Sequence, residues 1–124
     1  MSNFTVAVVE DNADNRLLLQ AILGDRYALV EYANGADALA GITSRRPDLV
    51  LLDISLPGMD GTEILSRIRR DAQLRGLPVI ALTAHAMAGD REKFLAAGFD
   101  DSITKPIIDE DELFRAIDRL IRKH

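Results

Sequence analysis

The chain has 124 residues, of which 48% are hydrophobic and 28% are charged; its net charge is -5 and it contains no cysteine. This composition is ordinary for a globular protein, rules out disulfides and thiolate metal sites, and argues against a general surface for nucleic acids or anionic membranes. No apolar run approaches the roughly 18 residues of a membrane-spanning helix, and the N-terminus lacks the pattern of a signal peptide. We therefore expect one cytoplasmic domain over residues 1–124, with no output domain.

Strands and helices are expected to alternate along the whole chain. Short apolar runs bounded by turn residues predict five strands, at Thr5–Val9, Tyr27–Tyr32, Leu49–Asp53, Pro78–Leu82 and Ser102–Thr104. Apolar residues at helical spacing predict five helices, from a cap at Asp11 or Asn12 to about Leu23, and over Gly35–Ser44, Thr62–Arg70, Met87–Ala97 and Glu110–Arg122.

Local signals mark where several of these helices begin and end. Asp60 with Glu63, and Asp109 with Glu112, have the spacing of a capping box, in which each side chain bonds the backbone of the other. Gly98 follows the fourth helix and can adopt the left-handed conformation that ends a helix.

Five strands alternating with five helices predict an α/β fold, in which a parallel sheet has helices on both faces. Right-handed crossovers leave few topologies, and we expect the strand order 2-1-3-4-5. In that order the first and third strands are neighbours, and the chain reverses direction between them. Ligands bind at such a switch point, outside the carboxyl ends of the strands.

Polar side chains stand at four of the predicted strand ends. Glu10 and Asp11 follow the first strand, and Asp53 closes the third, which is otherwise fully apolar. Thr83 ends the fourth strand and Lys105 ends the fifth. The expected strand order would bring these five side chains to one edge of the sheet.

This set of residues fits one type of chemistry. Several carboxylates held close together repel one another, and a hard cation such as Mg²⁺, which prefers oxygen ligands, relieves that repulsion. An aspartate such as Asp53 can act as the nucleophile in phosphoryl transfer through an aspartyl-phosphate. A metal ion, the ammonium of Lys105 and the hydroxyl of Thr83 can supply the positioning and charge neutralisation that such a reaction needs.

The chain resembles a response-regulator receiver domain of bacterial two-component signalling, with the flavodoxin-like sheet of CheY-like proteins. The resemblance covers residues 4–122. It rests on a set of motifs: Glu10-Asp11, Asp53 with Pro57-Gly58-Met59-Asp60-Gly61 after it, Thr83, and Lys105-Pro106.

The resemblance implies a phosphoacceptor switch and not an enzyme that turns over external substrates. Asp53 would accept a phosphoryl group from a phosphohistidine donor, and the protein would catalyse only its own phosphorylation and dephosphorylation. Asp11, Asp53 and the backbone carbonyl of Ser55 would hold Mg²⁺, and Glu10 would act on the metal through water.

The resemblance also assigns the residues of the switch. Lys105, Thr83 and Ala84 would contact the phosphoryl group and respond to it, and the bond before Pro106 would be cis. Receivers usually carry an aromatic residue three positions before the lysine, but here that position is Ser102. The usual coupling between the threonine and an aromatic side chain is therefore not expected.

The partners implied are a histidine kinase or a histidine phosphotransfer protein, and a separate output protein. The output protein would bind the face formed by residues 87–97, 101–104 and 109–122. The segment from Ala81 to Met87 resembles receivers of hybrid sensor kinases as much as free-standing ones, so a module from such a kinase is an alternative. The cluster Arg67, Arg69 and Arg70 is expected to be a solvated helix face, with no nucleic-acid or membrane partner.

Other functional classes fit the residues less well. An aspartate-nucleophile phosphatase of the haloacid-dehalogenase type needs a second acid two residues after the nucleophile, where this chain has Ser55. A flavodoxin-like cofactor carrier would need phosphate-binding backbone donors in its first loop, where this chain has Glu10 and Asp11. A pseudo-receiver that only binds partners would not need the full acidic set with Lys105.

Overall fold

The computed structural model describes residues 4–56, 58–84, 90–105 and 109–123. Its five parallel strands are β1 (Thr5–Val9), β2 (Ala28–Tyr32), β3 (Leu49–Asp53), β4 (Val79–Thr83) and β5 (Asp101–Thr104). The helices are α1 (Ala13–Leu23), α2 (Gly35–Ser44), α3 (Gly61–Arg70), α4 (Asp90–Ala97) and α5 (Glu110–Lys123). The predicted residues 87–89 of the fourth helix, and Pro106 with its expected cis bond, lie outside the described residues.

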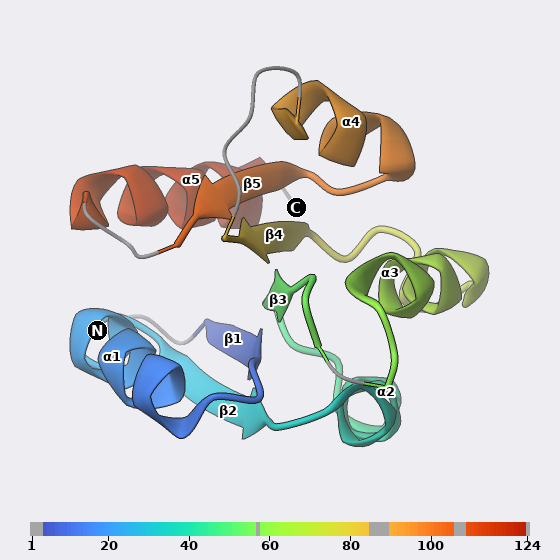
Figure 1. Cartoon of the computed structure of the whole chain (residues 1–124), viewed down its shortest axis with the longest axis horizontal. Coiled ribbons are helices and arrows are strands. Elements are labelled where there is room, and N and C mark those ends of the chain that lie inside the picture. Colours follow the sequence, from blue (N-terminus) through green and yellow to red (C-terminus); the bar gives the residue numbers. More distant parts are fainter. Residues whose placement is uncertain (1–3, 57, 85–89, 106–108, 124) are drawn as a thin grey trace.

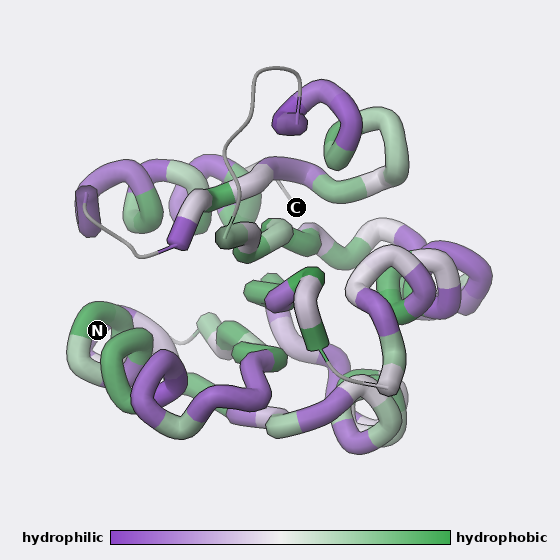
Figure 2. Tube along the Cα trace, in the orientation of Figure 1, coloured by the Kyte–Doolittle hydropathy of each residue, from purple (hydrophilic) through white to green (hydrophobic). Residues whose placement is uncertain are grey.

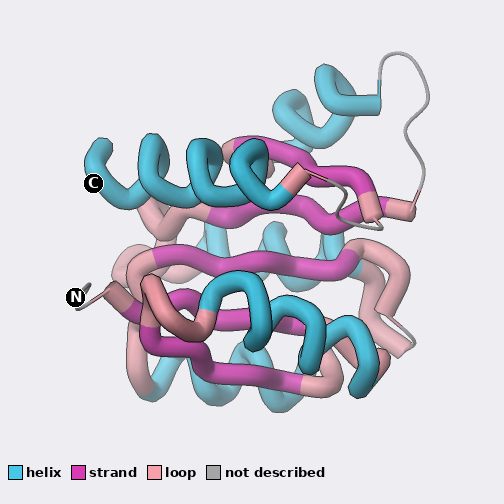
Figure 3. The backbone as a smooth tube through the Cα atoms, turned by 90° about the vertical axis from the view of Figure 1, so that its left-hand side faces the viewer, coloured by secondary structure: helices cyan, strands magenta, loops and turns pink. Residues whose placement is uncertain are grey.

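The strands form one sheet in the order β2-β1-β3-β4-β5, which confirms the predicted topology. Figure 1 looks along the strands and shows α1 and α5 on one face of the sheet, with α2 and α3 on the other. The view of Figure 3, turned by 90°, places α1 and α5 in front of the strands in the same way. Within the described residues, no helix is long and apolar enough to cross a membrane.

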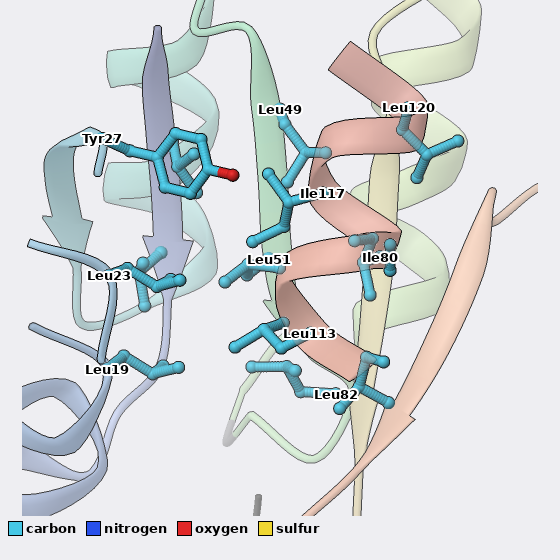
Figure 4. Close-up of a cluster of buried hydrophobic side chains, with 14 of the residues drawn as sticks. Leu19, Leu23, Tyr27, Leu49, Leu51, Ile80, Leu82, Leu113, Ile117 and Leu120 are labelled. Atoms are coloured by element: carbon cyan, nitrogen blue, oxygen red, sulfur yellow. The ribbon is translucent and has the colours of Figure 1, made fainter. Parts of the chain in front are cut away.

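Side-chain alternation along the strands divides the core into two clusters, one on each face of the sheet. Val6 and Val8 of β1 point to the α1 and α5 side, where they join the cluster shown in Figure 4 with Leu113 and Ile117 of α5. Ala7 and Val9 point to the other side, where the cluster includes Ala38 and Ile42 of α2 and Ile64, Leu65 and Ile68 of α3. Figure 2 shows the hydrophobic runs of the central strands between the two helix layers.

The helix starts follow the predicted signals in part. Asn12 caps α1, where its side chain accepts a hydrogen bond from the Asn15 amide. Asp60 caps α3, but it bonds the amide and hydroxyl of Thr62, both at 2.6 Å. The predicted capping box is only half formed: the Glu63 amide also bonds the Asp60 carboxylate, whereas the Glu63 carboxylate forms an ion pair with Arg67 one turn later.

A second correction concerns Arg69, which does not belong to a solvated face. It is only 24% exposed, and it donates to the carbonyls of Arg75, Leu77 and Gly98 and to the Asp100 carboxylate. The guanidinium thus links the end of α3 to the chain before β4 and before β5. Gly98 adopts φ +113°, the left-handed conformation predicted for this helix end.

Candidate functional site

The carboxylates predicted to meet do lie together at the carboxyl ends of β1 and β3. These two strands are paired in parallel register, with Val9 opposite Leu52, so the next residues, Glu10 and Asp53, emerge side by side. Glu10 is 1% exposed and Asp53 is 2% exposed, whereas Asp11 is exposed. One carboxylate oxygen from each of the three residues lies within 4.8 Å of those of the other two.

The first turn of α1 holds Glu10 in place. The Asn15 side-chain amide donates to Glu10 Oε1 at 3.2 Å, and the Asn12 backbone amide donates to Oε2 at 3.3 Å. Arg16 donates to the backbone carbonyl of Glu10 at 2.8 Å. We did not predict the contacts of Asn15 and Arg16 from the sequence. The available signal was their position one turn after the Asn12 cap, directly beside the acidic pair.

Lys105 reaches into the site from the end of β5. Its Nζ atom lies 3.0 Å from Asp53 Oδ2 and 3.1 Å from Glu10 Oε1. Its backbone amide donates to the Thr83 carbonyl at 2.7 Å, which fixes the start of this side chain against the end of β4. The lysine therefore bridges the two buried carboxylates and compensates part of their charge.

The local environment shifts the pKa values of Glu10 and Asp53 in opposite directions. Burial raises the pKa of Glu10, and the adjacent Asp53 adds to this effect. Burial also acts to raise the pKa of Asp53, but hydrogen bonds with Glu10, the Ser55 amide and Lys105 outweigh it and leave that pKa below its ordinary value. For Lys105, burial acts to lower the pKa, and the two carboxylates outweigh it and raise the value. At neutral pH the Asp53 carboxylate is therefore ionised and lies beside a cation.

The donor set fits a hard divalent cation. Three carboxylates of which two are buried present oxygen ligands to one small volume, and Mg²⁺ is commonly held by one or two carboxylates together with water and phosphate oxygens. The Ser55 amide donates to Asp53 Oδ1 at 2.9 Å, so the backbone of Ser55 lies next to the Asp53 carboxylate. The role of the Ser55 carbonyl as a metal ligand stays a prediction.

The remaining predicted residues lie on the neighbouring strands. Thr83 is 3% exposed at the end of β4. The amide of Ile54, the residue after Asp53, donates to the carbonyl of Leu82, the residue before Thr83, so the ends of β3 and β4 are joined here. Ala84 follows Thr83 and is exposed. Ser102 is partly buried on β5 and pairs with Ala81, two residues before Thr83.

Comparisons with known proteins agree on one family. A family model described as response regulator receiver domain matches residues 6–118. The polar-differentiation response regulator DivK of Brucella anthropi is 40% identical over 104 residues, which cover 83% of this chain and 85% of that protein. The sensor histidine kinase GacS of Pseudomonas protegens is 44% identical over 106 residues, which cover 82% of this chain but only 12% of the kinase.

Solved structures show the same likeness in three dimensions. The receiver domain of the sensor histidine kinase PA1611 of Pseudomonas aeruginosa, which has a magnesium ion coordinated in its active-site cleft, matches with a TM-score of 0.87 and 36% identity over 98% of this chain and 99% of that one. A response regulator structure from Chloroflexus aurantiacus matches with a TM-score of 0.90 and 28% identity, over the same shares of the two chains.

Proposed function

Because the chain belongs to the response regulator receiver domain family, we propose that Asp53 is the residue at which it accepts a phosphoryl group from a phosphohistidine donor. Domains of this family are phosphoacceptor switches of two-component signalling systems. The observation that supports Asp53 best is its buried carboxylate, which is ionised, lies 3.0 Å from Lys105 Nζ and shares one volume with Glu10 and Asp11.

The proposed transfer is a single displacement at phosphorus. An Asp53 carboxylate oxygen forms the new oxygen–phosphorus bond, the phosphorus–nitrogen bond of the donor breaks, and the departing imidazole takes a proton from water. Asp11, Asp53 and the Ser55 carbonyl would hold Mg²⁺, with Glu10 bonded to its water ligands; the ion supplies neutralisation of the phosphoryl charge. The similar PA1611 receiver holds magnesium in its cleft, which supports this assignment.

Lys105 would change partners when the phosphoryl group arrives. Its ammonium now bridges Asp53 and Glu10; phosphorylation converts one Asp53 oxygen into the bridging oxygen of an acyl phosphate and brings new anionic oxygens into the site. The lysine is then placed to donate to these oxygens. The Lys105 amide is bonded to the Thr83 carbonyl, so the base of this side chain is held at the end of β4.

The response would leave the site through Thr83 and Ala84. The Thr83 hydroxyl can donate to a phosphoryl oxygen in the phosphorylated state only, and such a difference between states is what shifts a conformational equilibrium. Ser102 is too small to fill space that Thr83 vacates. The response therefore depends on the chain that follows Thr83 and leads to α4.

The proposed partners are a donor protein that carries a phosphohistidine and a separate output protein. We propose that the donor approaches Asp53 over α1, where Leu17 and Leu18 are 65% and 44% exposed and directly follow Asn15 and Arg16, the residues that contact Glu10. We assign the output protein to the face formed by residues 90–97, 101–104 and 109–122, the described part of the face 87–97, 101–104 and 109–122 expected from the sequence. The chain matches most of the response regulator DivK and also a short part of the sensor kinase GacS. The proposed switch could therefore work as a separate protein or as one domain of a longer kinase.

The assignment of Asp53 is tested by intact mass after incubation with acetyl phosphate and Mg²⁺. The wild-type protein should gain one phosphoryl group, and Asp53→Asn should gain none. Asp60→Asn is the matched control, because it makes the same substitution nearby and asparagine serves equally well at the start of α3. Undiminished labelling of Asp53→Asn would move the phosphoacceptor to another residue.

A further inference from the structure

A hollow of about 450 Å³ lies between α4, β5 and α5, away from the carboxylates described above. Its charged lining consists of Arg91 of α4, Asp101 of β5, and Glu112, Arg115 and Arg119 of α5. Figure 1 shows β5 at the edge of the sheet, with α5 on one side of it and α4 on the other. The hollow therefore joins three elements that are separate in the sequence.

Asp101 organises this lining. The residue is 5% exposed, and both of its carboxylate oxygens are bonded. Oδ1 lies 3.0 Å from Arg91 and accepts from the Ser102 amide at 2.8 Å, while Oδ2 accepts from Arg119 at 2.7 Å. One buried carboxylate thus fixes two guanidinium groups, whose side chains are 59% and 54% exposed.

The two arginines keep the capacity to bind a second carboxylate. A guanidinium has five N–H groups, and a bond to Asp101 through one nitrogen leaves others on the same group. Arg115, which is 71% exposed, adds a third cation on the same helix as Arg119. Among the residues that line the hollow, three arginines stand beside two carboxylates, those of Asp101 and Glu112. Arg115 also lies 3.8 Å from Asp109 Oδ2, but this pair is exposed and therefore weak, so a carboxylate of a partner can replace it.

We propose that this hollow is the anchor for an acidic segment of the output partner, in which an aspartate or glutamate side chain binds the guanidinium groups held by Asp101. This inference rests on the proposed function for the assignment of this face to output. Arginine suits the role because its planar donors match a carboxylate in pairs. Apolar side chains of Ile103 and Ala116 complete the lining, so the bound segment would carry an apolar residue next to the acid.

The geometry also connects the anchor to the switch. Arg91 stands on α4, which follows Thr83 in the chain, whereas Arg119 stands on α5. The spacing of the two guanidinium groups therefore depends on how α4 packs against β5. A change that starts at Thr83 and moves α4 would alter the fit of a carboxylate between them.

Fluorescence anisotropy with a labelled hexaglutamate peptide, and hexaglutamine as its neutral counterpart, tests the anchor on the whole chain. Hexaglutamate should bind more tightly than hexaglutamine, and Arg115→Gln should weaken it roughly threefold, the effect of losing one exposed charge pair. Arg115→Gln leaves both bonds to Asp101 in place, so it does not expose a buried charge. Arg119→Gln should weaken binding as well, with Arg91 still paired to Asp101.

Arg45→Gln is the matched control, because it removes the same charge from an exposed position after α2 and should leave the affinity unchanged. The anchor would be overturned if hexaglutamate and hexaglutamine bound with equal affinity. It would also be overturned if Arg45→Gln weakened hexaglutamate binding as much as Arg115→Gln does. Sedimentation that shows a dimer which Arg115→Gln dissociates would overturn it in favour of a second copy of the chain. Labelling of the wild-type protein with acetyl phosphate reports separately on Asp53: wild-type protein that is labelled but does not bind hexaglutamate overturns only the anchor, and wild-type protein that binds hexaglutamate but is not labelled overturns only the proposed phosphoacceptor.

Discussion

Lys105 has two roles that a single substitution can separate. Before phosphorylation it compensates Glu10 and Asp53, which are almost completely buried, and only afterwards can it meet a phosphoryl group. A buried carboxylate that loses its cationic partner is strongly destabilising, because the charge that remains is neither solvated nor paired. The resting protein should therefore depend on this lysine for stability as well as for signalling.

We predict that Lys105→Met lowers the free energy of unfolding in EDTA by about 2 kcal/mol, less than for a fully buried pair because the lysine is partly exposed. Mg²⁺ should restore part of the loss, since a cation that binds only the folded state stabilises it. Urea denaturation in EDTA and in Mg²⁺ measures both effects. The control is Lys93→Met on exposed α4, and a Lys105→Met midpoint equal to this control in EDTA would contradict the prediction.

Asp60 sets the start of α3, the helix that follows the loop after Asp53, and its role should depend on pH. The Thr62 hydroxyl and amide both donate to its carboxylate and lower the pKa of Asp60. A carboxyl whose pKa is lower in the folded state adds stability above its unfolded pKa, and this stability is lost as the pH falls through the folded pKa.

We therefore predict that Asp60→Ala costs about 1 kcal/mol at neutral pH, the usual effect of removing a helix cap. The difference from wild type should shrink as the pH falls below the unfolded pKa of about 4, and reach its minimum once the folded carboxyl is protonated. Thermal unfolding from neutral to acidic pH measures the trend. Asp60→Asn should retain the stability at neutral pH, and a pH-independent cost for Asp60→Ala would show that the charge of the cap is irrelevant.

The path from the site to α4 can be tested with two substitutions on neighbouring strands. Thr83→Ala removes the hydroxyl that we expect to bond the phosphoryl group, a charge-assisted bond worth about 1.5–3 kcal/mol. We predict that this variant is still phosphorylated, but that backbone amide shifts across Asp90–Ala97 on phosphorylation are suppressed. Ser102→Ala should leave these shifts nearly intact. If Ser102→Ala suppresses them as fully as Thr83→Ala, the serine is itself the relay.

Arg69 joins parts of the molecule that are distant in the sequence. Its bonds to Leu77, Gly98 and Asp100 connect the end of α3 to the starts of β4 and β5, and Asp100 also accepts from the Val79 amide. The network therefore fixes how the second half of the sheet meets α3, at the end of the strands opposite to Asp53.

We predict that Arg69→Gln lowers the free energy of unfolding by about 2 kcal/mol, the range for hydrogen bonds that involve a charged group. Arg67→Gln on the same helix should change it by less than about 1 kcal/mol, because its pair with Glu63 is exposed. Urea denaturation of both variants gives the comparison. Similar losses for the two arginines would contradict the structural role of Arg69.

The sequence was sufficient for the sheet order and for the meeting of Glu10, Asp11, Asp53 and Lys105, because both follow from rules about parallel strands. Apolar runs of about five residues located the strands, and the polar residues after them had to gather at one edge. The roles of Arg69 and Asp101 could not be predicted in this way. The partners of Arg69 are 6 to 31 residues away and Arg119 is 18 residues from Asp101, and no local pattern distinguishes a clamped arginine from a solvated one.

The register of β1 against β3 makes the candidate site a test of correct folding. Glu10 meets Asp53 only because Val9 stands opposite Leu52, and a slip of one residue would turn every side chain of the strand to the opposite face. A slip of two residues would preserve the faces but carry Glu10 about 7 Å along the sheet. A molecule in which β1 and β3 pair in another register should therefore fail to accept a phosphoryl group, even if it is compact. Phosphorylation thus reports that these two strands are correctly aligned.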